Sequence, residues 1–208
     1  RLFQKGQLLR VAASDLKGTL PLMKISDSLT WIAEAVLQEV LHLSWRQLVA
    51  RHGTPLDRHG NACDPGFIIV GYGKLGGLEL GYGSDLDLVF IHDADAQRDT
   101  VGGTKALDGA SFFARLGQKV IHLLTTSMGS GLLYEVDMRL RPSGASGLLV
   151  TSLDGFAQYQ REQAWTWEHQ ALVRARVVVG DPAVAARFDG VRAAVLAQPR
   201  AIATLRQE

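Results

Sequence analysis

The sequence predicts an α+β fold in which a small mixed β-sheet carries a group of carboxylates, helices flank the sheet, and further helical segments occupy both ends. Three observations predict it. A buried strand over Phe67–Val70 leads through a glycine-rich loop into a second apolar strand that starts at Asp85. The segment Leu132–Arg141 alternates apolar and polar residues with the period of a strand. Apolar residues at helical spacing fill the segments on either side.

The composition is that of a globular protein. The 208 residues are 47% hydrophobic, and 22 basic against 21 acidic residues give no reason to expect nucleic acid or an anionic membrane as partner. No apolar run approaches the roughly 18–20 residues of a membrane span, and no signal peptide is visible. The single cysteine, Cys63, excludes an internal disulfide, so we expect a reducing, cytoplasmic location.

The chain divides into three parts. We expect an N-terminal helical segment over residues 1–53, a catalytic core over residues 54–152, and a C-terminal helical part of the same domain over residues 153–208. The chain starts without methionine and stops within a helical pattern. We therefore expect it to be a piece of a longer protein.

Two helices are expected in the N-terminal segment. The first covers Arg1–Ala13, and Gly18 with Pro21 interrupts the pattern after it. A longer amphipathic helix begins at an N-cap among residues 26–28 and ends near Gly53, a residue that suits a C-cap. Its apolar side is formed by Leu29, Ile32, Ala33, Val36, Leu37, Val40 and Leu41.

The loop after the first strand predicts a site for phosphate and metal. Glycine lets the backbone approach a ligand closely, so the loop can turn its N–H groups toward phosphate oxygens. Asp85 and Asp87 lie two apart at the start of the next strand and project together beside this loop. Neighbouring carboxylates repel each other, and a bound Mg²⁺ ion would relieve that repulsion. Metal-dependent nucleotidyl transfer needs this combination.

Two alternatives exist for the loop: a glycine-rich turn with two solvated aspartates, and a dinucleotide site. Residues 71–76 fit the G-x-G-x-x-G pattern, and Asp93 ends the next strand about twenty residues later. That fold needs a crossover helix of about ten or more residues after the third glycine. Only residues 77–84 are available, and Gly81 and Gly83 disfavour a helix there. We therefore reject the dinucleotide alternative.

The alternating segment Leu132–Arg141 completes the predicted site. Its polar side carries Asp137, Arg139 and Arg141. Asp137 would complete a trio of carboxylates, and the two arginines would neutralise phosphate charge. A solvated sheet surface is the alternative interpretation of the same pattern.

Helices are expected to dominate the rest of the chain. We expect one over about residues 108–126, one from Leu153 to about Ala164 capped by Ser152, and a last one after Asp181. The inward side of the last helix is predicted to be Ala185, Phe188, Val191, Ala194 and Val195. The pattern over residues 165–176 fits helix and strand equally.

Three motifs in order closely resemble the glutamine synthetase adenylyltransferases. They are GYGKLGGLELGYGSDLDLVF, YEVDMRLRPSGASGLLV and WTWEHQALVRARVVVGD, and the resemblance covers about Leu29 to Pro182. It implies a nucleotidyltransferase fold of the DNA polymerase beta superfamily. In this family one half of the enzyme attaches AMP to a tyrosine of glutamine synthetase and the other half removes it by phosphorolysis. The residues of these motifs are similar to those of the attaching half.

The resemblance implies ATP as substrate and two Mg²⁺ ions as cofactors, with Mn²⁺ as an alternative. Catalytic and metal-binding roles fall on Asp85, Asp87 and Asp137. Nucleotide or phosphate binding is expected of Gly73, Lys74, Gly76, Gly77, Gly83, Ser84, Arg139 and Arg141. Glutamine synthetase is the implied protein substrate, and a nitrogen regulatory protein of the PII type is an implied partner of the full-length enzyme.

Several roles stay open in the sequence. Glu79 is either a surface acid or a brace for the loop through pairing with a base, and Glu168, Arg174 and Arg176 either support the site or form structural ion pairs. The alternatives for function are the adenylyl-removing reaction on the same fold and a non-catalytic module that senses nucleotide.

Overall fold

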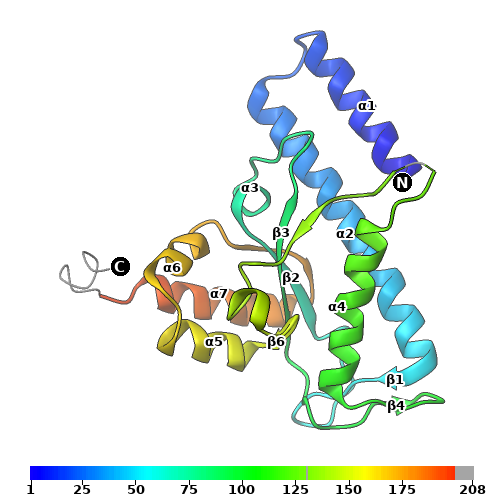
Figure 1. Ribbon diagram of the computed structural model, residues 1–208, viewed down its shortest axis with the longest axis vertical. Helices are drawn as coiled ribbons and strands as arrows, with labels where there is room; N and C mark the ends of the chain where they lie inside the picture. Colours follow the sequence, from blue (N-terminus) through cyan, green and yellow to red (C-terminus); the bar gives the residue numbers. More distant parts are fainter. Residues whose placement is uncertain (130, 200–208) are drawn as a thin grey trace.

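A five-stranded mixed sheet lies at the centre of the computed structural model, which describes residues 1–129 and 131–199 (Figure 1). Its strands are β2 (Phe67–Gly71), β3 (Leu86–His92), β5 (Val136–Asp137), β6 (Val150–Ser152) and β7 (Arg176–Gly180). β2 lies between β3 and β7 and runs antiparallel to both. β5 and β6 pair with β3 in parallel, β5 near its start and β6 near its end. The predicted α+β fold with a small mixed sheet is confirmed.

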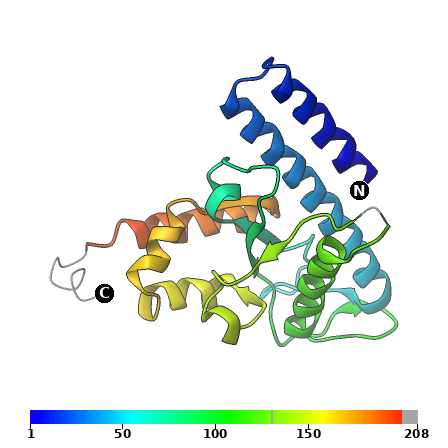
Figure 2. The same ribbon diagram turned by 45° about the horizontal axis from the view of Figure 1, so that its top comes forward.

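Helices cover both faces of this sheet. The helices of the described residues are α1 (Leu2–Leu16), α2 (Leu22–His52), α3 (Gly73–Gly76), α4 (Gly109–Thr125), α5 (Leu153–Glu162), α6 (Thr166–Leu172) and α7 (Pro182–Leu196), with a 3₁₀ turn η1 (Gly144–Ser146). α2 and α4 lie on one side, and α5, α6 and α7 lie on the other (Figures 1 and 2). Within the described residues, no helix combines the length and apolar character needed to cross a membrane.

The apolar runs of β2 and β3 are explained by two separate hydrophobic cores. Phe67 and Ile69 belong to the core formed with α2 and α4, whereas Ile68 and Val70 belong to the core formed with α5 and α7. Successive side chains of a strand point to opposite faces, so a strand covered on both faces has no polar side. All four side chains are fully buried.

The N-terminal helices differ from the prediction in their bounds, since α1 ends at Leu16 instead of Ala13. α2 begins at Leu22, with Pro21 in the N-cap position, instead of at a cap among residues 26–28. Ser28 Oγ donates to Lys24 O at 2.7 Å, so this hydroxyl is satisfied inside the helix and does not cap it. The predicted end at Gly53 is confirmed: this residue has φ +84, and a Cβ there would lie 2.2 Å from Val101 O. β1 (Gly53–Thr54), which follows directly, pairs with β4 (Val101–Gly102) in a separate two-stranded sheet.

The predicted strand over Leu132–Arg141 is wrong for most of its length. Only Val136 and Asp137 pair with β3. The chain turns immediately afterwards, because the backbone N–H of Arg139 donates to Asp137 Oδ1 at 2.8 Å and that of Arg141 to Met138 O at 3.3 Å. Side chain–backbone bonding of this kind competes with the ladder of a sheet and ends the strand.

The remaining helices agree with the prediction. Asp108, Ser152 and Asp181 accept hydrogen bonds from the first turns of α4, α5 and α7 at the expected positions. The segment left open becomes α6 followed by β7. In α7 the buried residues are Val184, Phe188 and Val195, whereas Ala194 is exposed, contrary to the prediction. Residues 200–208 of the predicted C-terminal helical part lie outside the described residues.

A buried histidine at the end of β3 makes stability depend on pH. His92 stacks on Phe113 with ring centroids 4.6 Å apart, and its Nδ1 accepts from the Ala94 N–H at 3.2 Å. Burial lowers the pKa of His92 to about 4 from 6.5. Between these two pH values the unfolded chain takes up a proton that the folded chain does not. The free energy of unfolding therefore falls as pH drops through this window.

We predict that His92→Gln removes this pH dependence. Protonation of His92 in the unfolded chain lowers the free energy of unfolding by about 2 kcal/mol at pH 5 relative to pH 7.5. This follows from a pKa of about 4 in the folded and 6.5 in the unfolded chain. Urea unfolding at both pH values should show a correspondingly smaller loss in the variant than in the unaltered chain. Equal losses in the two proteins would contradict the prediction.

Candidate active site

Three carboxylates meet at the edge where β3 and β5 begin their pairing. Asp85, Asp87 and Asp137 offer ligand oxygens that all lie within 4.8 Å of one another. Asp87 and Asp137 are direct partners in the parallel register of the two strands, so their side chains project to the same side. Asp85 stands just before β3, and the Leu86 N–H donates to Glu135 O at 3.0 Å next to it. We call these three residues the carboxylate cluster.

The electrostatics of the carboxylate cluster favour a cation. Burial, followed by the charges of Asp85 and Asp137, raises the pKa of Asp87, while Arg139 and Lys74 oppose the rise. The ionised form of Asp87 is therefore penalised until a positive charge reaches the cluster. Oxygen donors arranged in this way are the ligands that Mg²⁺ and Mn²⁺ prefer.

Arg139 supplies part of that positive charge in the structure. Its Nε and Nη2 donate to Asp137 Oδ2 at 2.7 and 2.5 Å. Hydrogen bonding from Arg139 lowers the pKa of Asp137, which keeps this carboxylate ionised. The Arg139 side chain is 83% exposed, so it is free to exchange this partner for another anion.

Gly73 is required by the carboxylate cluster itself. The residue has φ +51, and a Cβ at this position would lie 2.4 Å from Asp87 Oδ2. Gly76 has a similar role toward the rest of the fold, because its Cβ would lie 1.8 Å from Arg174 O. These two glycines let the α3 turn approach the protein's own atoms, whereas the sequence suggested approach to a phosphate.

The amides of the loop are partly used within the loop. The N–H groups of Gly76 and Gly77 donate to Tyr72 O and Gly73 O, both at 3.0 Å. Ser84 closes a turn with Gly81, since its N–H donates to Gly81 O at 3.2 Å and its Oγ accepts from the Gly81 N–H at 3.1 Å. The phosphate-binding roles predicted for Gly76, Gly77 and Ser84 thus have no support from these contacts.

Arg141 is turned toward the backbone. Its Nη1 donates to Met138 O at 2.7 Å and its Nη2 to Ala145 O at 3.1 Å. These bonds shape the loop that contains η1. The sequence predicted that Arg139 and Arg141 lie on the same face of one strand. This prediction is wrong, because the strand ends at Asp137 and the two side chains take different partners.

The residues whose roles the sequence left open form structural contacts. Glu79 pairs with Arg174 at 2.5 Å, so it braces the loop by pairing with a base, and Arg176 pairs with Glu34 at 2.5 Å. Glu168 accepts hydrogen bonds from Tyr159 Oη at 3.0 Å and from the Trp165 N–H at 3.2 Å. Asp93 pairs with Arg58 and Arg187 and takes no part in the carboxylate cluster.

A cavity beside the cluster brings in residues that the sequence did not indicate. It has a volume of about 290 Å³ and lies between α1 and the segments that carry Asp85 and Glu135. Its lining includes Lys5 and Leu8 of α1. No motif marks α1, and about eighty residues separate it from the carboxylates in the sequence. Only the folded chain brings these residues together.

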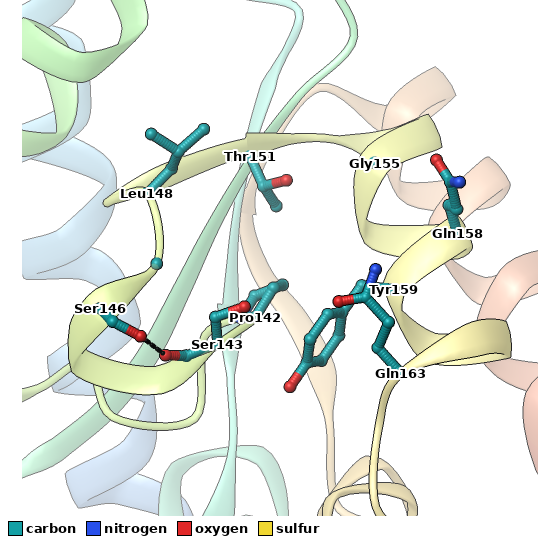
Figure 3. Close-up of a pocket in the computed structure, with 10 residues that line it drawn as sticks. Pro142, Ser143, Ser146, Leu148, Thr151, Gly155, Gln158, Tyr159 and Gln163 are labelled. Carbon is teal, nitrogen blue, oxygen red and sulfur yellow. Dashed lines mark hydrogen bonds between the residues drawn. The ribbon is translucent and has the colours of Figure 1, made fainter.

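A larger cavity, of about 490 Å³, lies between the η1 loop and α5 (Figure 3). The ring of Tyr159 faces Pro142 and Ser143 across it, and Ser146 Oγ donates to Ser143 O at 2.8 Å on its rim. Its lining contains no charged side chain. The carboxylate cluster is therefore the better candidate for binding metal and phosphate, although the cavity there is smaller.

Comparison with known proteins identifies the family of the chain. The family model for Glutamate-ammonia ligase adenylyltransferase matches residues 1–191. The chain belongs to this family. The resemblance found in its motifs is thereby confirmed.

Curated relatives carry the same family description. The chain is 66% identical over its whole length to the bifunctional glutamine synthetase adenylyltransferase/adenylyl-removing enzymes of Pseudomonas putida and Pseudomonas aeruginosa. It is 60% identical to the enzyme of that name from Thioalkalivibrio sulfidiphilus. The chain spans only about a fifth of the length of these relatives, 21% or 22% of each.

We predict that Gly73→Ala weakens metal binding at the carboxylate cluster. The added methyl group would displace Asp87 Oδ2, and alanine disfavours φ +51. Affinity for Mn²⁺, measured by calorimetry, should fall about tenfold or more, as for other changes that shift a metal ligand. Gly83→Ala is the matched control, because a Cβ there meets no atom within 4 Å. Equal Mn²⁺ affinities for the two variants would contradict the prediction.

Proposed function

We propose that this chain transfers AMP from ATP to a tyrosine hydroxyl of glutamine synthetase and releases pyrophosphate. One observation carries the proposal: Asp85, Asp87 and Asp137 meet within 4.8 Å in a chain of the adenylyltransferase family. The names of the curated relatives state an adenylyltransferase activity on glutamine synthetase for those proteins.

The carboxylate cluster is proposed to hold two divalent cations, Mg²⁺ or alternatively Mn²⁺. All three aspartates would be ligands, and Gly73 leaves the space that Asp87 needs. Cations bound there would offset the charge of the triphosphate and make the acceptor hydroxyl more acidic. The raised pKa of Asp87 supports this assignment, because that carboxylate lacks a sufficient partner in the protein alone.

Lys74 and Arg139 are proposed to bind the triphosphate of ATP. Both lie close enough to Asp87 for their charges to lower its pKa. Arg139 can move from Asp137 to a phosphate oxygen because its side chain is exposed and its guanidinium has the fork geometry that phosphates accept. The backbone at Gly73 and Lys74 begins the α3 turn on the same flank.

The transfer step is a displacement at the α-phosphorus of ATP. The tyrosine oxygen forms a new bond to phosphorus, and the bond from phosphorus to the pyrophosphate oxygen breaks with its electron pair leaving on pyrophosphate. The phenol proton passes to a carboxylate oxygen of Asp137 and then to solvent. Hydrogen bonds from Arg139 lower the pKa of Asp137 and keep it ionised before ATP binds. Transfer of Arg139 to a phosphate oxygen would raise this pKa and make Asp137 a better proton acceptor. A free phenol has a pKa near 10 and is mostly protonated at pH 7.

The protein substrate, the location and the regulatory partner are proposed from the family resemblance. We propose glutamine synthetase as protein substrate, a cytoplasmic location, and contact with a PII-type regulatory protein through the full-length enzyme. Neither nucleic acid nor a membrane is proposed as partner, in line with the balanced charge of 22 basic and 21 acidic residues.

The adenylyl-removing reaction is the second candidate, because the relatives' printed names contain both activities. It would convert modified glutamine synthetase and phosphate into ADP. Supplying AMP-modified glutamine synthetase with phosphate and assaying ADP separates the two. A non-catalytic nucleotide sensor is less well supported, since such a module would not need three converging carboxylates.

We predict that Asp85→Asn and Asp87→Asn each reduce AMP transfer about a thousandfold or more, because loss of a metal ligand removes several kcal/mol of transition-state stabilisation. Pyrophosphate release and tyrosine labelling, with ATP, Mg²⁺ and glutamine synthetase, measure the effect in the full-length protein. Asp93→Asn is the control, since Asp93 pairs with arginines away from the cluster. Activity at the control level in both cluster variants would refute the metal assignment.

A further inference from the structure

The cavity between α1 and the carboxylate cluster has a fixed shape. We call it the α1 cavity. At one end of α1, Gln4 Nε2 donates to Leu133 O at 2.6 Å and Arg1 Nη2 to Thr126 O at 2.5 Å. At the other end, Tyr82 Oη donates to Asp15 Oδ2 at 3.1 Å. α1 is thus hydrogen-bonded to the segments that lead into Asp85 and Asp137, and these contacts hold it beside the cavity.

The α1 cavity opens directly onto a proposed metal ligand. Asp85 lines it, together with Ser84 of the preceding turn. A group inside the cavity therefore lies next to the carboxylate cluster. Its volume of about 290 Å³ admits one side chain and is small for a whole nucleotide.

The lining of the α1 cavity is unsuited to a triphosphate. Leu8, Leu132 and Leu133 supply apolar wall, and Asp85 and Glu135 add two negative charges against the single positive charge of Lys5. A polyanion would meet repulsion and apolar surface there. The cations that can hold a triphosphate, Lys74 and Arg139, do not line this cavity.

An aromatic side chain with one polar end fits the same lining. Its ring would pack on the leucines, and its hydroxyl would reach Asp85, whose ligand oxygen lies within 4.8 Å of that of Asp137, the proposed proton acceptor. In an in-line displacement the attacking and leaving oxygens lie on opposite sides of phosphorus. An acceptor oxygen beside Asp85 and a triphosphate held by Lys74 and Arg139, which do not line the cavity, are compatible with this requirement.

We propose that the α1 cavity binds the phenol side chain of the acceptor tyrosine, with Leu8 and Lys5 of α1 determining acceptor binding. The proposal rests on the proposed function. It assigns α1 to the acceptor site and leaves the bond changes of the transfer step as described: phosphorus gains the tyrosine oxygen and loses pyrophosphate.

The test uses a substitution that narrows the α1 cavity and leaves the carboxylates unchanged. Leu8→Trp in the full-length protein should raise the KM for glutamine synthetase about tenfold or more, because the indole would occupy space that the phenol ring needs and overpacking opposes binding. The KM for ATP should stay within about twofold. Leu9→Trp is the matched control, since Leu9 is the next residue of α1 and is 72% exposed.

A second pair of variants guards against misfolding of Leu8→Trp. Lys5→Glu reverses an exposed charge at the cavity, and Arg10→Glu makes the same change on α1 away from it. Of these two variants, Lys5→Glu should raise the KM for glutamine synthetase and Arg10→Glu should leave it unchanged. Unchanged acceptor kinetics in both Leu8→Trp and Lys5→Glu, or equal changes in the KM values for ATP and acceptor, would overturn this inference alone. Absence of AMP transfer by the unaltered protein would overturn the proposed function and this inference with it.

Discussion

The parallel pairing of β3 with β5 is the constraint on which the candidate site depends. It consists of only two residue pairs, and one of them sets Asp87 opposite Asp137. A shift of one residue would turn Asp137 to the opposite face of the sheet, because side chains alternate along a strand. The register is secured by what surrounds it: Val136 packs on the core beside Leu86, and the Asp137 carboxylate ends the strand by accepting the N–H of Arg139.

Holding three carboxylates together costs free energy in the protein alone, and the residues around the carboxylate cluster accommodate it. Asp87 is penalised by burial and by its two neighbours, while Arg139 partly neutralises Asp137. Gly73 contributes by lacking a side chain where Asp87 Oδ2 must lie. Such features are typical of a site whose missing charge arrives with a ligand.

Much of the fold and the carboxylates themselves were predictable from local pattern. The strand at Phe67–Val70, the caps at Asp108, Ser152 and Asp181, and the convergence of three aspartates follow from periodicity, capping chemistry and spacing. The sequence could not show the long-range contacts. The end of β5 depends on where one carboxylate finds a donor, and the need for Gly76 depends on Arg174, almost a hundred residues away. The place of α1 beside Asp85 has no local signature at all.

The division of β2 between two hydrophobic cores has a consequence for how the molecule holds together. Neighbouring residues such as Ile68 and Ile69 are buried by helices from opposite ends of the chain. Removing the C-terminal helices would leave half of the central strands facing water and would also withdraw β7 from the edge of β2. Truncation at either end of the chain should therefore expose one face of β2 and β3, and β3 is the strand that carries Asp87.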